Sequence, residues 1–269
     1  MDALLFYHFS RKLTGSTFNA FEYYISILEH NPEFKLIFIN ANDMEIDYLC
    51  SIFENRYDLD DIGYRKNIEH MEFCKIVYLN QVLNKALLLD YGTVWKIKSV
   101  LKCNHIIQIC EKTEDPEYRI NGKLAPVTAY GEMPFVHRDK EYRMKLGFNR
   151  FKKLKDVKEA VYVNSPFNGD TEFLKTIELP PNKPVIFKSG NHLSNLFEQF
   201  DEYIYYHANQ WFDPHPRLFL EYAYYGKKIT YYNRPNIKDG SYYRYKDLME
   251  NGLENRTLDE NDEIVRLFI

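Results

Sequence analysis

Short apolar runs of strand length alternate with segments of helical periodicity along most of the chain. Residues 3–9 form the first apolar run, a polar loop that contains Gly15 follows, and residues 18–30 carry apolar side chains at helical spacing. Pro32 interrupts the helical pattern before a second apolar run at residues 34–39. A strand, a loop, a helix and a strand in this order predict a βαβ unit, and such units build parallel sheets.

The same alternation continues through two series of segments that are separated by a basic stretch. In the first series, we expect strands at 75–79, 85–89, 105–110 and 125–135 and helices at 46–53 and 91–101. In the second series, we expect strands at 160–163, 184–188, 202–206 and 228–232 and helices at 171–177, 194–200 and 214–225. Two such series predict an α/β protein with two Rossmann-like, doubly wound domains. We place one domain at residues 1–155, joined by the C-terminal segment 245–269, and the other at residues 156–244.

The composition is typical of a globular protein that folds in water. The 269 residues are 45% hydrophobic, which is enough to build one large core or two small ones. Aromatic residues make up 16% of the chain, and we expect most of its 23 tyrosines in the core. No apolar run reaches the roughly 20 residues of a membrane-spanning helix, and the N-terminus lacks a signal-peptide pattern. We therefore expect a cytoplasmic protein with no membrane association and no obligate protein partner.

Cysteine and histidine positions give no sign of a metal site. The four cysteines form no Cys-x-x-Cys pair and have no histidine at zinc spacing, so we interpret them as reduced thiols. Nor does a metal-ligand pattern join the histidines His8, His137, His207 and His215. We expect neither a catalytic metal nor another cofactor.

Charge is distributed unevenly along the chain. The net charge of −4 argues against a general nucleic-acid binder, but residues 138–158 hold nine basic side chains against three acidic ones. A local excess of this kind can steer a polyanion such as DNA toward the protein. A solvated basic helix face gives the same pattern, so the sequence leaves both interpretations open.

The most informative segment, residues 201–232, predicts a strand, a loop, a helix, a glycine and a second strand. The helix begins at Pro214, a favoured position because the missing N–H has no intrahelical partner in the first turn. The free backbone N–H groups of that turn and the helix dipole favour binding of a diphosphate. Arg217, one turn into the helix, is positioned to add a charge-assisted contact to phosphate.

This segment resembles the second domain of retaining glycosyltransferases with the GT-B fold, in which two Rossmann-like domains face each other across a cleft. Those enzymes carry two carboxylates separated by seven residues and followed by a small residue and a glycine, and the chain has Asp213, Glu221, Ala223 and Gly226 in this order. The chain departs from the pattern by having Asp as the first carboxylate and Pro-His-Pro-Arg in place of a glycine-rich run. The alternative interpretation is a helix with an N-terminal Asp cap and a surface Glu.

The resemblance implies a role for each part of the donor site in the domain 156–244. Glu221 accepts hydrogen bonds from the donor ribose, and Asp213, Lys188 and Arg217 are the catalytic residues of a transfer that retains the anomeric configuration. The other residues expected to bind the donor lie at the helix start and in two glycine-containing loops: Pro214, His215, Pro216, Leu218, Ser189, Gly190, Gly15 and Ser16. Ordinary turn chemistry is the alternative explanation for the two loops.

The whole chain also resembles the small GT-B transferases of phages, including those of T-even-like phages that add sugars to hydroxymethylcytosine in DNA. This resemblance implies a UDP-sugar donor and, as acceptor, double-stranded DNA whose hydroxymethylcytosine already carries a first sugar. The expected acceptor residues lie in the domain 1–155 and in the basic stretch: Arg11, Lys12, Asp90, Glu132, Arg143, Lys145, Arg150, Lys152 and Lys153. Two alternatives stay open, namely a transferase that acts on a cell-surface polysaccharide and a non-enzymatic binder of nucleotide sugars or nucleic acid.

Overall fold

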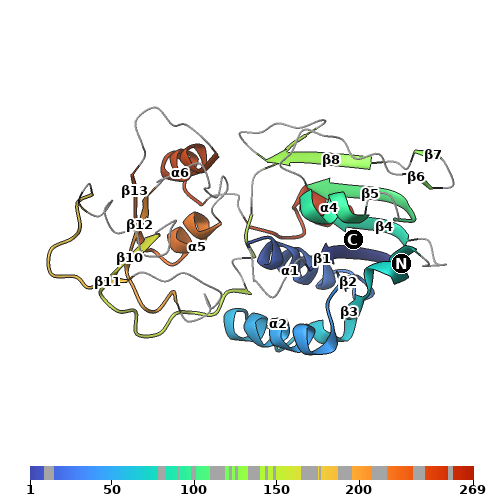
Figure 1. Ribbon diagram of the computed structural model, residues 1–269, viewed down its shortest axis with the longest axis horizontal. Coiled ribbons are helices and arrows are strands. Elements are labelled where there is room, and N and C mark those ends of the chain that lie inside the picture. Colours follow the sequence, from blue (N-terminus) through green and yellow to red (C-terminus); the bar gives the residue numbers. More distant parts are fainter. Residues whose placement is uncertain are drawn as a thin grey trace. The chain divides into compact units, whose positions relative to one another are not determined.

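Two parallel β-sheets organise the computed structural model, and helices pack against both of them (Figure 1). The sheets belong to two units, one of residues Met1–Phe151 with Arg256–Ile269 and one of residues Lys152–Asn255. The chain is therefore an α/β protein with parallel-strand sheets, which confirms the predicted class. The structure describes residues 1–8, 15–77, 83–89, 91–97, 101–109, 119–120, 123–124, 127–132, 140–142, 145–147, 150–164, 175, 177–186, 196–206, 217–232, 240–253 and 257–269.

The sheet of the first unit has seven described strands in the order β3-β2-β1-β4-β5-β8-β9, and every neighbouring pair is parallel. After β3 the chain crosses to the other side of β1, which is the switch that defines a doubly wound sheet. The strands are β1 (Asp2–Tyr7), β2 (Lys35–Ile39), β3 (Ile68–Met71), β4 (Leu83–Leu88), β5 (Cys103–Ile109), β8 (Val127–Glu132) and β9 (Lys140–Tyr142). Between β5 and β8 in the chain lies a short antiparallel hairpin of β6 (Arg119–Ile120) and β7 (Lys123–Leu124).

The strand β1 is buried on both faces, which explains its continuous apolar run. Ala3 and Leu5 pack in one cluster with Val94, while Leu4 and Phe6, which alternate with them along the strand, are also buried. Val94 belongs to one of the described helices of this unit, which are α1 (Gly15–Leu28), α2 (Asp43–Arg56), α3 (Phe73–Val77), α4 (Tyr91–Ile97) and α7 (Glu263–Arg266). Burial of the sheet between helices is the arrangement expected of a parallel sheet.

A layer of aromatic side chains joins α1 to α2. Phe21 of α1 stacks on Phe53 of α2 with 3.7 Å between the ring centroids. Beneath this layer, the carboxylate of Glu22 is fully buried and accepts hydrogen bonds from Tyr57 Oη at 2.6 Å and from the backbone N–H of Gly147 at 3.1 Å. These bonds satisfy the buried charge and tie the segment around residue 147 to α1.

The C-terminal end of the chain completes the first unit. Phe268 packs edge-on against Phe34 with 5.1 Å between centroids, and the Asn31 side-chain amide donates to the Phe268 carbonyl at 2.8 Å. Asp262 is the N-cap of α7, because its side chain accepts from the backbone N–H groups of Ile264 and Val265. Residues from both ends of the sequence therefore share one core.

Two predicted elements of the sequence are wrong. The expected strand at 75–79 does not form, because Phe73–Val77 is the helix α3 and the third strand of the sheet is the polar segment Ile68–Met71. A run of apolar residues this short fits a strand or a buried helix equally well, and Ile76 is buried from a helix. The expected helix at 194–200 is also wrong over its described part, since residues 196–199 form turns.

The sheet of the second unit has four described strands in the order β11-β10-β12-β13, and all its pairs are parallel. The strands are β10 (Val161–Asn164), β11 (Val185–Ile186), β12 (Glu202–Tyr206) and β13 (Lys228–Tyr232), and the described helices are α5 (Leu218–Tyr224) and α6 (Gly240–Asn251). Aromatic side chains fill one side of its core, where Tyr203 and Tyr222 lie 4.4 Å apart and Tyr162 stacks on Tyr203. Helix α6 lies in this unit, and the chain returns to the first unit at Arg256.

The helices in the described part of the chain are too short or too polar to cross a membrane.

Candidate functional site

The second sheet has a topological switch point beside β10. Strand β11 lies on one side of β10 and β12 on the other, so the connections from this point run in opposite directions. The carboxyl ends of β10 and β12 meet there, since Asn164 is in register with Tyr205. Ligands of open parallel sheets bind at this kind of edge. Residues 207–216 connect the end of β12 to α5 and lie outside the described residues. Four of the predicted site residues belong to this segment: Asp213, Pro214, His215 and Pro216.

Arg217 and Glu221 form a buried ion pair where α5 begins. Arg217 precedes the helix, Glu221 lies one turn further on, and Arg217 Nε donates to Glu221 Oε1. The side chains are only 4% and 1% exposed, respectively. The spacing of four residues places the two side chains on the same face of the helix, which is why they meet. The structure thus brings together two of the predicted donor-site residues, and it joins them to each other.

The position of α5 is fixed by aromatic packing below the ion pair. Phe219 lies edge-on to Tyr205 at 5.0 Å between centroids, and Tyr222 lies edge-on to Phe200 at 5.1 Å. Leu218, the predicted diphosphate contact, is the first residue of the helix and is half-buried. Because the helix is anchored on both flanks of the pair, its backbone holds Arg217 and Glu221 in a defined position relative to β12.

The turn after α5 contains a buried lysine that the sequence analysis did not single out. Gly226 adopts a positive φ of 68°, which favours glycine, and the next residue, Lys227, extends its Nζ to the carbonyl oxygens of Phe197 and Phe200. Burial lowers the pKa of Lys227 to about 8, and the charge of Asp201 opposes the shift. The available signal in the sequence was a lysine directly after the glycine that ends a helix.

The first sheet has its own switch point, beside β1. Here the backbone N–H of Tyr7 donates to Thr93 Oγ1 at 3.0 Å, and the N–H of His8 donates to the carbonyl oxygen of Ile39 at 2.8 Å. His8 is buried, and this desolvation lowers the pKa of its imidazole, with an opposing effect from Glu45. The imidazole is therefore neutral at pH 7 and stands at the carboxyl edge of the sheet.

The predicted ligand residues of the first unit are described only in part. Gly15 and Ser16 begin α1, the helix that follows β1, with Gly15 exposed and Ser16 half-buried. Glu132 is the last residue of β8. The remaining predicted site residues lie outside the described residues: Arg11, Lys12, Asp90, Arg143, Lys188, Ser189 and Gly190.

Two basic residues of the stretch 138–158 form ion pairs within the first unit. Lys145 Nζ lies 2.5 Å from Asp262 Oδ2, so it binds the carboxylate that caps α7. Arg150 donates from Nε to Glu29 at 2.6 Å and from one terminal nitrogen to Asp61 at 2.7 Å, and this bond holds the pKa of Asp61 below its ordinary value. These contacts stabilise the fold and compete with any contact of the same groups to DNA phosphate.

The side chains of Lys152 and Lys153 are exposed. The carbonyl oxygen of Lys152 accepts a hydrogen bond from Tyr225 Oη at 3.1 Å, which fixes the backbone there to the end of α5. Of the predicted acceptor residues with described side chains, Lys152 and Lys153 are exposed, whereas Lys145 and Arg150 are partly buried.

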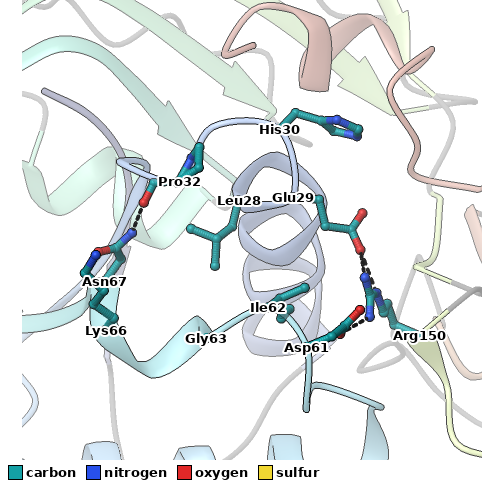
Figure 2. Close-up of a pocket in the computed structure, with 10 residues that line it drawn as sticks. All are labelled: Leu28, Glu29, His30, Pro32, Asp61, Ile62, Gly63, Lys66, Asn67 and Arg150. Carbon is teal, nitrogen blue, oxygen red and sulfur yellow. Dashed lines mark hydrogen bonds and ion pairs between the residues drawn. The ribbon is translucent and has the colours of Figure 1, made fainter.

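A pocket of about 540 Å³ lies beside the Arg150 ion pairs (Figure 2). It is lined by the end of α1 and the residues that follow it, by the short helix Tyr64–Asn67 and the segment before it, and by Arg150. Since α1 leads into the amino end of β2, the pocket lies at the edge of the sheet opposite to the strand ends at which ligands of such sheets bind. It is therefore distinct from the predicted donor site, although Arg150 is one of the predicted acceptor residues.

The described parts of the chain contain no cluster of three or more His, Cys, Asp or Glu side chains that could hold a metal ion.

Comparison of the sequence with protein-family models and with curated proteins finds no match.

Proposed function

We propose that the protein is a glycosyltransferase that uses a nucleotide-sugar donor and has the two-domain GT-B arrangement. One observation carries the proposal: the Arg217–Glu221 pair opens the helix that follows β12, at the switch point of a parallel sheet. A carboxylate at this place is suited to accept hydrogen bonds from ribose hydroxyls, which is the role of the second carboxylate in the retaining enzymes that the sequence resembles. The parallel sheet of the first unit supports the presence of a second nucleotide-type domain.

The chemistry of the transfer requires stabilisation of the negative charge that develops on the leaving diphosphate. In the proposed site, Lys188 and the backbone amides around Pro214 supply this stabilisation, and Asp213 lies beside the transferred sugar. The sugar keeps its anomeric configuration, because the acceptor attacks from the face that the diphosphate leaves.

For the acceptor, we propose duplex DNA that contains glucosylated hydroxymethylcytosine. The exposed side chains of Lys152 and Lys153 support this choice, since exposed lysines in a basic stretch provide sequence-independent attraction to phosphate. The proposed donor is a UDP-sugar.

A transfer assay tests the proposal. The protein is incubated with radiolabelled UDP-sugars and, in parallel, with unmodified, hydroxymethylated and glucosylated DNA. We expect label to enter the glucosylated DNA and to be absent when Asp213→Asn replaces the wild type. Met249→Ala, which changes an exposed residue of the same unit, serves as the matched control and keeps full activity. Label that enters a polysaccharide acceptor but none of the DNAs would contradict the proposed DNA acceptor and leave the proposed enzyme class in place. Label that enters neither kind of acceptor would contradict the whole proposal.

A further inference from the structure

The pocket between the end of α1 and the short helix Tyr64–Asn67 has an apolar wall (Figure 2). Its volume of about 540 Å³ is in the range of pockets that hold small organic molecules. The buried side chain of Leu28 and the half-buried side chain of Ile62 form the wall, and Pro32 extends it at the rim. A ligand with an apolar part is therefore stabilised when its surface and that of the wall leave water.

One side of the pocket is anionic. Arg150 Nε donates to Glu29 Oε1 at 2.6 Å, and one terminal nitrogen of Arg150 donates to Asp61 Oδ1 at 2.7 Å. The single guanidinium compensates one of the two carboxylates, so one negative charge is left on this side. The second oxygen of Glu29 has no hydrogen-bond partner among the described residues, and the side chain of Asp61 is 70% exposed. Both carboxylates are therefore able to accept a hydrogen bond from an ammonium group.

The opposite side of the pocket is cationic. Figure 2 shows Lys66 and Asn67 across Leu28 from Arg150. The Asn67 side-chain amide donates to the carbonyl oxygen of Pro32, which holds this side in place. The side chain of Lys66 is exposed and has no ion-pair partner in the described ranges of the chain. Its ammonium is therefore able to bind a carboxylate.

We propose that the pocket binds a small dipolar molecule, with an ammonium and a carboxylate at opposite ends of an apolar chain. The ammonium lies beside Glu29 and Asp61, and the carboxylate lies beside Lys66. The chain packs against Leu28, whereas the ring of His30, which also lines the pocket, points away from it (Figure 2). A ligand with one charge would compensate only one side of the pocket. The inference goes beyond the proposed glycosyltransferase activity and does not depend on it.

Isothermal titration with three probes tests the proposal. The first probe, 6-aminohexanoate, carries both charged ends, whereas hexylamine lacks the carboxylate and hexanoate lacks the ammonium. In the wild type we expect 6-aminohexanoate to bind at least about tenfold more tightly than either of the others, because loss of one end removes a charge-assisted hydrogen bond.

Two variants assign the two ends of the ligand. Lys66→Met should lower the affinity for 6-aminohexanoate to that for hexylamine, and it should not weaken the binding of hexylamine. Asp61→Asn removes the uncompensated negative charge, so it should weaken the binding of 6-aminohexanoate and not that of hexanoate. The matched controls are Lys102→Met and Asp60→Asn, which change exposed residues of the same unit that do not line the pocket. Both controls should keep the wild-type affinities.

Three results would overturn the inference. Wild-type protein that does not bind 6-aminohexanoate, or that binds all three probes equally, would show that the pocket does not recognise both ends. Equal losses of affinity in the variants and in their controls would show an effect of general surface charge. Because all four substitutions are at exposed positions, we expect every variant to be folded, and circular dichroism checks this.

Discussion

Arg217 and Glu221 neutralise each other in the interior of the second unit, and Glu22 of the first unit is satisfied by Tyr57 and the backbone of Gly147. Both solutions follow from the cost of burying a charge, which is high unless a partner compensates it. The two buried carboxylates differ in what they do for the molecule. Glu22 ties two segments of the fold together, whereas the Arg217–Glu221 pair stands at a strand end where a ligand is expected.

Breaking the buried pair has a large effect on stability, and replacing it has a small one. We expect Arg217→Met to lower the free energy of unfolding by about 3–5 kcal/mol, because it removes the cation of a buried ion pair and leaves the carboxylate of Glu221 in place. The double change Arg217→Met with Glu221→Leu recovers most of this loss. Urea unfolding, monitored by circular dichroism, measures the free energy of unfolding of the single and the double variant. A single variant as stable as the wild type would show that the pair is not buried in solution.

Lys227 gives the second unit a stability that depends on pH. Its pKa is about 8 in the folded protein, against 10.5 as the ordinary value. The unfolded chain therefore binds more protons between these values, so stability rises with pH across the window, by roughly 2–3 kcal/mol. The neutral amine still has two N–H groups for its two carbonyl partners. Lys227→Met should remove this rise, and equal pH profiles of unfolding for variant and wild type would contradict the assignment.

The residues of the candidate site were easier to predict than their contacts. Asp213, Arg217 and Glu221 stand out by spacing after a strand, and the resemblance assigns Arg217 and Glu221 to separate ligand groups. A spacing of four residues in a helix also brings an arginine and a glutamate together, and the structure shows this contact. Sequence alone cannot tell which partner a charged side chain has, because that depends on whether the helix face is buried.

At the scale of the element, α2 shows how local sequence determines where a helix begins. Asn42 Oδ1 accepts from the Glu45 backbone N–H at 3.0 Å, and Glu45 Oε2 accepts from the Asn42 N–H at 2.9 Å. This reciprocal pair is a capping box, which satisfies two of the backbone donors that a helix start leaves without partners.

Removing the cap should weaken the first unit by a modest amount. We expect Asn42→Ala to cost about 1 kcal/mol, and Asn42→Asp to keep the stability of the wild type. Met44→Ala is the matched control, since Met44 lies in the same first turn and is 78% exposed. Thermal unfolding measures the three variants, and an alanine variant that melts with the control would contradict the role of the cap.

In the first sheet, the strands buried in the middle were predictable, and the edge strands β3 and β9 were not. Residues 3–9 and 105–110 are apolar because both faces of β1 and β5 are covered, so their pattern is strong. Strand β3 lies at the edge of the sheet and has the polar sequence Ile68-Glu69-His70-Met71. Partial exposure removes the apolar pattern of β3, so the sequence predicts a strand at the nearby apolar run 75–79 instead.

At the scale of the whole molecule, the first unit is closed by residues from the far end of the chain. Phe268 is buried against Phe34, and Lys85 Nζ donates to the carbonyl oxygen of Leu267. The C-terminal residues that follow α7 therefore contribute to the stability of this unit.

A pair of adjacent substitutions tests this closure. Phe268→Ala should lower the free energy of unfolding by about 3–5 kcal/mol, because it removes a buried ring and leaves a cavity against Phe34. Ile269→Ala changes the next residue, which is 56% exposed, and should have little effect. Similar losses in both variants would mean that the C-terminal segment is not packed as described.

The central claim is that the strand ends beside β10 and β12 hold a nucleotide diphosphate with its ribose at Glu221. A crystal structure of the protein soaked in UDP tests it most directly. We expect the ribose hydroxyls within hydrogen-bond distance of the Glu221 carboxylate, with Arg217 still bound to Glu221 and the diphosphate on the segment that precedes α5. Nucleotide density in the pocket beside Arg150, and none near Glu221, would contradict the account.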